Sequence, residues 1–126
     1  MSWVLMLDDL RDFEIVKIPE IYDCYEKVLV RTYDEFVLII IHKGLPTAVF
    51  MDHDLATEHY IYADKPRIPY EKFNQKTGLS ATKYLIDYCE KNNKKLPKFY
   101  CHSMNMVGRK NILNLVHKYQ KKEQEN

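Results

Sequence analysis

The chain has 126 residues, 46% of them hydrophobic, which suits one compact domain with a continuous core. Nineteen Lys and Arg against eighteen Asp and Glu give a formal net charge of +1, which excludes a global field that would attract a polyanion. We therefore expect a single domain over residues 1–122 with a polar tail at 123–126, and any preference for phosphate must come from local geometry.

The cysteines and the N-terminal segment predict the cellular setting. Three cysteines in no CxxC spacing favour free thiols in a reducing compartment. The first seven residues lack a basic leader and are too few for a signal peptide, and the apolar run 36–41 is too short to span a bilayer. We expect a cytoplasmic protein without membrane association, whose oligomeric state the sequence leaves open.

Short apolar runs alternate with helical patterns along the chain. Strands are predicted at 3–7, 28–31, 47–51 and 98–101. Between the first two strands, residues 10–26 lack periodicity and predict an irregular connection, which could hold a short strand at 13–17. Helices are predicted over 34–43 and 108–121, and a third runs to residue 92 from a start at Thr77 or Ser80.

Capping residues and prolines set the limits of these helices. Thr32 or Asp34 can cap the first helix, and Gly44 supplies its stop. Residues 55–77 carry two prolines and no apolar periodicity, and predict a long surface loop. Alternating strands and helices predict a three-layer α/β fold, in which a parallel sheet carries helices on both faces.

Polar side chains follow three of the predicted strands. Asp8-Asp9 ends the first, Asp52-His53-Asp54 the third and His102-Ser103 the fourth. The carboxyl ends of neighbouring parallel strands meet at one edge of the sheet, where open α/β folds bind ligands. The sequence therefore predicts a site at this edge.

The side chains at this edge suit phosphate chemistry assisted by a metal ion. Converging carboxylates repel one another unless a divalent cation offsets them, so we predict Mg²⁺ or Mn²⁺ at Asp8, Asp9 and Asp52. Such an ion would stabilise the charge that grows on phosphate oxygens during attack. Histidine is the side chain that ordinarily exchanges protons near neutral pH, so His53 and His102 are the candidate general acid and base, in either order. The predicted catalytic residues are His53, His102, Asp54 and Ser103.

Residues near the start of the last helix are predicted to bind the remaining phosphate oxygens. Ser103, Asn105 and the backbone N–H groups near Gly108 would do so as helix starts commonly do. Arg11 or Arg109 would add a fork-shaped clamp. The predicted phosphate-binding residues are Arg11, Asn105, Gly108, Arg109 and Asn111.

Structural roles are the alternative for each of these features. Asp8-Asp9 could form a turn with a helix cap, and the hydroxyl of Ser103 could cap a helix. Aromatic residues of the long loop could pin it to the core or stack a nucleobase: Tyr60, Tyr62, Tyr70 and Phe73. Three other histidines lack partners at metal-ligand spacing and are expected on the surface or in loops: His42, His59 and His117.

Several motifs, in order along nearly the whole chain, carry a resemblance to a known family. They are Leu7-Asp8-Asp9-Leu10-Arg11, the segments 30–36 and 44–46, Asp52-His53-Asp54-Leu55, Thr77-Gly78 and the segment 102–112. Together they resemble the cyclic-phosphate processing receiver domains. The resemblance implies a receiver-type, flavodoxin-like fold and a role in processing cyclic phosphates. Ordinary signalling receivers also end a fifth strand with a lysine, and nothing after His102 resembles that strand.

Three functions follow from these observations. The first is a metal-dependent phosphoesterase acting on a cyclic phosphate of a nucleotide or an RNA end, without DNA sequence recognition. The second is a module that binds a nucleotide without cleaving it. The third is a receiver-like regulatory domain phosphorylated on Asp52, which the missing lysine argues against.

Overall fold

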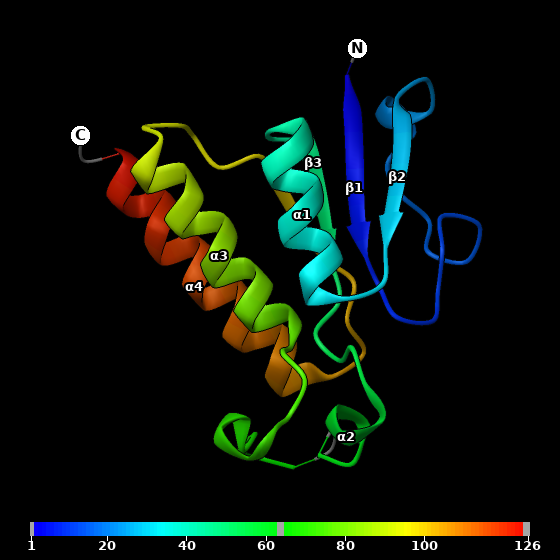
Figure 1. Ribbon diagram of the computed structural model, residues 1–126, viewed down its shortest axis with the longest axis vertical. Coiled ribbons are helices and arrows are strands. Elements are labelled where there is room, and N and C mark those ends of the chain that lie inside the picture. The colour runs from blue at the N-terminus through cyan, green and yellow to red at the C-terminus, as the bar shows by residue number, and fades with distance from the viewer. Residues whose placement is uncertain (1, 63–64, 125–126) are drawn as a thin grey trace.

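The structure is a computed structural model that describes residues 2–62 and 65–124 (Figure 1). Four parallel strands form one sheet in the order β2-β1-β3-β4. The elements are β1 (Trp3–Leu7), β2 (Glu26–Val30), α1 (Tyr33–Lys43), β3 (Ala48–Met51), α2 (Thr57–Tyr60), α3 (Gly78–Lys91), β4 (Lys98–Cys101) and α4 (Met106–Gln124). All four predicted strands are present, and the predicted receiver-like α/β fold is confirmed.

The central strands β1 and β3 are buried along their whole length, as parallel strands covered on both faces require. Their side chains alternate between two apolar clusters, one on each face of the sheet. The first cluster includes Leu5, Leu7, Val49 and Met51, and it packs against residues of α1, α3 and α4. The second includes Val4, Met6, Ala48 and Phe50.

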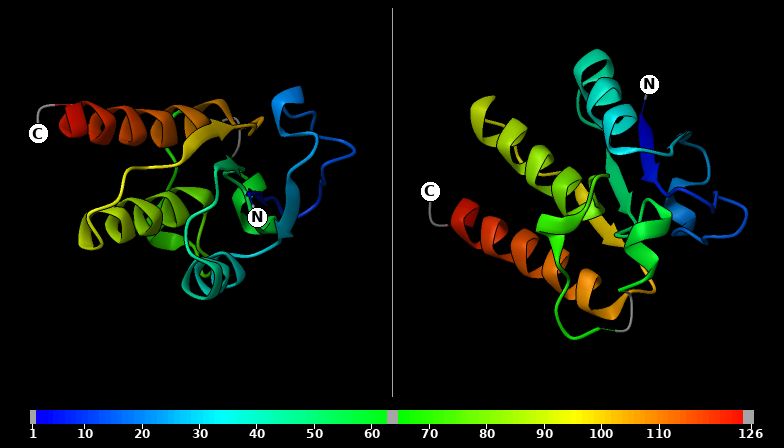
Figure 2. Two further views of the ribbon diagram at one scale, coloured as in Figure 1. Left: turned by 90° about the horizontal axis from the view of Figure 1, so that it is seen from above. Right: turned by 60° about the horizontal axis from the view of Figure 1, so that its bottom comes forward.

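The prediction of helices on both faces of the sheet is wrong for the second face, which is covered by residues 10–25 instead of a long helix (Figure 2). This segment contains one turn of 3-10 helix, Glu20–Tyr22. The ring of Tyr22 packs edge-on against Phe50, with 5.8 Å between ring centroids, and its hydroxyl lies 3.2 Å from that of Tyr100. The short strand predicted at 13–17 is wrong, because the backbone and carboxylate oxygens of Asp12 accept hydrogen bonds from the following amides and hold a turn.

The helices begin and end at capping residues. Thr32 caps α1, since its hydroxyl accepts a hydrogen bond from the Glu35 amide at 3.1 Å, and Gly44 ends the helix with φ +82°. Helix α4 begins at Met106, earlier than predicted, and continues to Gln124, so residues 123 and 124 of the predicted tail are helical. Residues 125 and 126 lie outside the described part of the chain. None of the helices described here combines the length and the apolar character of a membrane span.

The long loop after β3 is tied to the core by His59. Its Nδ1 accepts a hydrogen bond from the Leu55 amide at 2.8 Å, and its Nε2 donates to the Gln75 carbonyl at 2.9 Å. Only 1% of His59 is exposed, so this histidine lies in the loop, as expected, but is buried and not on the surface. The loop also contains α2 and a 3-10 helix at Tyr70–Lys72, which the sequence did not predict.

Candidate active site

Three of the predicted strand tips meet at the carboxyl edge of the sheet. Strand pairing places Leu7, Met51 and Cys101 in one row, so the residues that follow them are neighbours. One ligand atom each from Asp8, Asp52 and His102 lies within 4.8 Å of the other two. The predicted convergence of these three tips is therefore present in the structure.

Asp8 is buried and uses both of its carboxylate oxygens in hydrogen bonds. Oδ1 accepts from the amides of Leu10 and Arg11 at 2.9 and 2.8 Å. Oδ2 accepts from Arg11 Nε at 3.0 Å and from His102 Nε2 at 2.8 Å. Burial alone would raise the pKa of Asp8, but the bonds from His102, Arg11 and Leu10 outweigh it and lower the pKa to about 2. Asp8 is thus a fixed negative charge.

Asp52 has the opposite electrostatic character. Burial and the negative charge of Asp8 raise the pKa of Asp52 to about 6. Its Oδ1 accepts a hydrogen bond from the His53 amide at 2.8 Å and lies 3.6 Å from Arg11 Nη2. A carboxylate in this position gains from any additional cation placed next to it.

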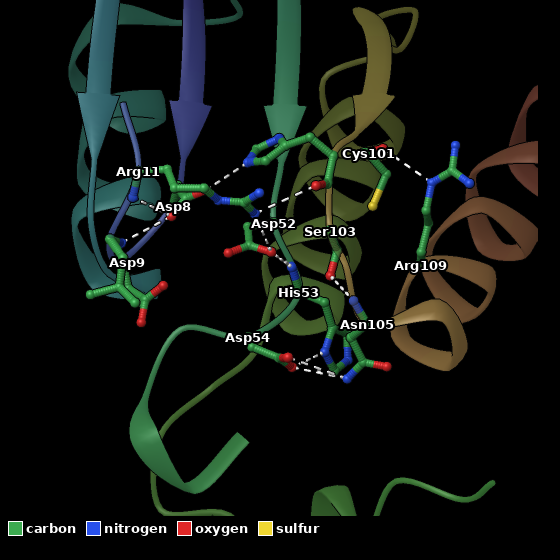
Figure 3. Close-up of polar contacts among 12 residues, drawn as sticks. Asp8, Asp9, Arg11, Asp52, His53, Asp54, Cys101, Ser103, Asn105 and Arg109 are labelled. Atoms are coloured by element: carbon green, nitrogen blue, oxygen red, sulfur yellow. Dashed lines mark hydrogen bonds and ion pairs between the residues drawn. The ribbon is translucent and has the colours of Figure 1, made fainter. Parts of the chain in front are cut away.

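Arg11 supplies positive charge between these two carboxylates. Its guanidinium reaches from Asp8 toward Asp52, and its Nη2 lies 3.4 Å from the His102 carbonyl oxygen (Figure 3). Arg31 fixes the backbone of this turn, because its Nη1 donates to the carbonyls of Arg11 at 2.9 Å and Asp8 at 3.4 Å. Arg31 is not among the predicted site residues, although its position directly after β2 was a signal for it.

His102 is the third member of the cluster, a position for which the sequence predicted Asp9. Because Asp8 is ionised, His102 donates its Nε2 hydrogen to Asp8. Its Nδ1 is buried and has no hydrogen-bond partner among the described residues. Asp9 lies outside the cluster and accepts a hydrogen bond from the Tyr60 hydroxyl at 2.8 Å. Burial and the nearby charge of Asp8 raise the pKa of Asp9.

His53 lies behind the site, with 1% of its surface exposed. Its Nδ1 is 2.6 Å from Asp54 Oδ1, and its Nε2 is 2.8 Å from the Tyr70 hydroxyl. Gly108 lies against the imidazole so closely that a Cβ there would be 2.4 Å from His53 Cγ. Asn111, predicted to bind phosphate, donates to the Tyr70 hydroxyl at 3.0 Å. Both ring nitrogens of His53 are therefore engaged inside the protein.

The start of α4 is held by side-chain caps. Ser103 Oγ accepts from the Asn105 amide at 3.1 Å, and Asn105 Oδ1 accepts from the Gly108 amide at 3.0 Å. Asn105 Nδ2 also donates to Asp54 Oδ1 at 3.1 Å. Arg109 is exposed and donates to the Cys101 carbonyl, on the side away from the carboxylates (Figure 3). Asn105, and not Ser103, is therefore the cap of α4, and the hydroxyl of Ser103 holds the turn before the helix; the Gly108 amide already has an acceptor.

A pocket of about 270 Å³ opens onto this edge of the sheet. Its lining combines polar and apolar side chains: Leu10, Arg11, Asp52, Asp54, Tyr60, Ser103, Met104 and Asn105. The side chains of Leu10 and Met104 are mostly exposed to solvent at 71% and 84%. Of the loop aromatics, Tyr60 lines the pocket, whereas Tyr70 packs on His53 and Phe73.

Glycine at position 78 allows the long loop and α3 to approach the site. Its amide donates to the His53 carbonyl at 2.8 Å. A Cβ at this position would lie 1.7 Å from the Asp52 carbonyl oxygen. The close approach explains a glycine at the first position of α3.

The donor set at the strand tips fits a divalent cation. Two carboxylates and one imidazole are common ligands of divalent metals, and their separation is short enough for one ion. Burial, followed by the charge of Asp8, keeps the pKa of Asp52 raised even with Arg11 present, so an added cation would stabilise its ionised form.

The comparisons with known proteins agree with this architecture. A family model described as cyclic-phosphate processing receiver domain matches residues 3–118. No curated protein and no solved structure matches the chain.

Proposed function

Because the chain belongs to the cyclic-phosphate processing receiver domain family, we propose that it is a metal-dependent phosphoesterase that opens a cyclic phosphate of a nucleotide or an RNA end. The observation that carries this proposal is the meeting of Asp8, Asp52 and His102 beside a pocket that can hold a phosphate. A metal ion held there would support hydrolysis, because it would stabilise the charge that develops on the phosphate oxygens during attack.

The proposed metal ligands are Asp8, Asp52 and His102, with Asp9 near the rim. A bound ion would supply positive charge for the phosphate oxygens as the bond to water forms. The imidazole favours Mn²⁺ over Mg²⁺, because Mg²⁺ prefers ligand sets made only of oxygen. Arg11, which also lines the pocket, would bind a phosphate oxygen through its guanidinium.

Asp54 is the carboxylate best placed to accept a proton from the attacking water. It lines the pocket, and His53 and Asn105 hold its orientation through bonds of 2.6 and 3.1 Å. In this arrangement His53 is a positioning residue behind Asp54. Water oxygen would bond to phosphorus as the bond from phosphorus to one ribose oxygen breaks, and that ribose oxygen would take up a proton. Ser103, which lines the pocket, is the candidate donor for this second proton, with solvent restoring its own, because His102 is a ligand of the metal ion in this arrangement.

Turnover of defined substrates tests the proposal. Cyclic mononucleotides and RNA with a 2′,3′-cyclic end should each be incubated with Mn²⁺ or Mg²⁺ and followed by phosphorus NMR. We expect opening of at least one substrate, loss of that activity with chelator, and a decrease of at least about 100-fold in Asp54→Asn. Asp87→Asn, which changes an exposed carboxylate on α3, is the matched control. Absence of turnover with every substrate and both metals would refute catalysis.

A second candidate function is capture of a nucleotide without cleavage. The engagement of both ring nitrogens of His53 favours it, since this imidazole has no free atom directed into the pocket. The exposed side chains of Leu10 and Met104 also offer apolar contact to a base beside the phosphate. Calorimetry with recovery of unchanged ligand would distinguish binding from hydrolysis.

A further inference from the structure

The hydrogen-bonding capacity of Asp8 is full in this structure. A carboxylate has about four lone-pair sites, and Asp8 receives four hydrogen bonds from nearby groups. Two come from backbone amides, and two reach Oδ2 from Arg11 Nε and His102 Nε2. A metal ion can therefore bind Oδ2 only if a present partner leaves it.

Arg11 is the partner that can leave without disturbing the fold. Its side chain is 27% exposed and borders the pocket, so it has a direct path away from the carboxylates. The bond from Arg31 to the Arg11 carbonyl at 2.9 Å would hold the backbone while the side chain moves. His102, in contrast, follows β4 with its Nδ1 buried and stays beside the ion as a ligand; exchange of its Nε2 proton for the ion frees one position on Oδ2 but leaves the guanidinium of Arg11 next to that position.

A guanidinium and a divalent cation cannot both occupy the space between Asp8 and Asp52, because like charges at such short range repel strongly. We propose that Arg11 is an exchangeable counter-ion: it neutralises Asp8 and Asp52 when no divalent ion is bound, and the ion displaces it into the pocket, where it binds phosphate. This inference rests on the proposed function, because the ion is taken to occupy the metal site proposed there.

This exchange couples metal binding to phosphate binding. The planar guanidinium fork matches phosphate oxygens, but it is engaged by Asp8 until the ion arrives. Metal should therefore increase the affinity for phosphate, and phosphate should increase the affinity for metal by the same factor. The site would bind phosphate well only when its metal is in place.

The first test measures metal affinity in three proteins by calorimetry with Mn²⁺ at pH 7.5. We expect Arg11→Gln to bind Mn²⁺ at least about tenfold more tightly than the wild type, because the competing cation has been removed. Arg109→Gln is the matched control, since it removes the same charge from a side chain directed away from the carboxylates. Its affinity should stay within about threefold of the wild type. Unchanged or weaker binding by Arg11→Gln would overturn the inference.

The second test uses the wild-type protein and does not depend on the folding of a variant. The Arg11 Nε–H resonance should be protected from exchange with water in metal-free protein and lose that protection at saturating Mg²⁺. Inorganic phosphate should bind at least about tenfold more tightly with Mg²⁺ than without it. An unchanged Arg11 resonance at saturating Mg²⁺ would show that the guanidinium stays in place and would contradict the exchange.

The outcomes separate this inference from the proposed function. If neither ion binds the wild type, both the exchange and the metal-dependent reaction are refuted. If Arg11→Gln binds Mn²⁺ more tightly but no cyclic phosphate is turned over, the exchange stands and catalysis is refuted. If substrates are turned over while Arg11→Gln binds Mn²⁺ as the wild type does, only the exchange is refuted.

Discussion

Replacing Asp52 by asparagine should stabilise the metal-free protein at neutral pH. The pKa of Asp52 is raised from 3.8 to about 6, by burial and by the charge of Asp8. The folded state therefore binds more protons than the unfolded state between about pH 4 and 6. The stabilising contribution of protonated Asp52 is complete below about pH 4 and is lost as the pH rises through about 6.

The size of the effect follows from the pKa shift. About two pKa units correspond to about 3 kcal/mol at most, at roughly 1.4 kcal/mol per unit. Asparagine keeps an oxygen that can accept the His53 amide but carries no charge. The free energy of unfolding should be measured in urea at pH 4 to 8 with chelator present, using the fluorescence of the buried Trp3. The free energy of unfolding of Asp52→Asn should exceed that of the wild type at pH 8 and approach it near pH 4.

Asp8→Asn is the matched control, because the same chemical change should have the opposite sign. Hydrogen bonds outweigh burial and lower the pKa of Asp8 from 3.8 to about 2, so its ionised form stabilises the folded state above about pH 4. The free energy of unfolding of Asp8→Asn should be lower than that of the wild type by up to about 2 kcal/mol at pH 8. If Asp52→Asn is no more stable than the wild type at pH 8, or if its pH profile runs parallel to that of the wild type, the electrostatic reasoning is wrong.

Three further substitutions test contacts around the site. Gly78→Ala should lower the free energy of unfolding by more than about 3 kcal/mol, because its Cβ would meet the Asp52 carbonyl oxygen at 1.7 Å; a smaller loss in urea would show that α3 can shift. Tyr70→Phe removes the hydroxyl partner of His53 and should cost about 1–3 kcal/mol by thermal unfolding, whereas an unchanged midpoint would mean that water replaces it. Thr32→Ala removes the cap of α1 and should cost about 1 kcal/mol in the same assay, unless another group accepts the free amide.

The meeting of the strand tips could be predicted from the sequence because parallel pairing leaves few alternatives. When neighbouring parallel strands each end in polar residues, those residues lie together at one edge of the sheet. The pairing of Leu7 with Met51 and of Met51 with Cys101 brings the three strand ends together in this way. The fold class followed from the same alternation of strands and helices. The spacing of apolar and polar residues along the chain was sufficient to predict both the fold class and the meeting of the strand tips.

The direction of each side chain beyond the strand ends could not be predicted in this way. Asp8 and Asp9 are adjacent in sequence, yet only Asp8 faces the cluster, because the turn that follows bends back to donate two amides to it. The burial of His53 depends on Tyr70 and Gly108, which come from distant segments. Such contacts depend on tertiary packing, which leaves no periodic signal in the sequence.

The unequal covering of the sheet has a consequence for local unfolding. Helices satisfy their own backbone hydrogen bonds, whereas residues 10–25 cover the second face largely through side chains such as Tyr22. Segments with fewer protected amides open at lower free energy, so hydrogen exchange should be faster over 10–25 than over α3. Arg11 lies at the beginning of this segment, and each opening would loosen the turn that presents its guanidinium to Asp8. The proposed exchange of cations at the site is thereby connected to a segment that is held in place largely by side-chain packing.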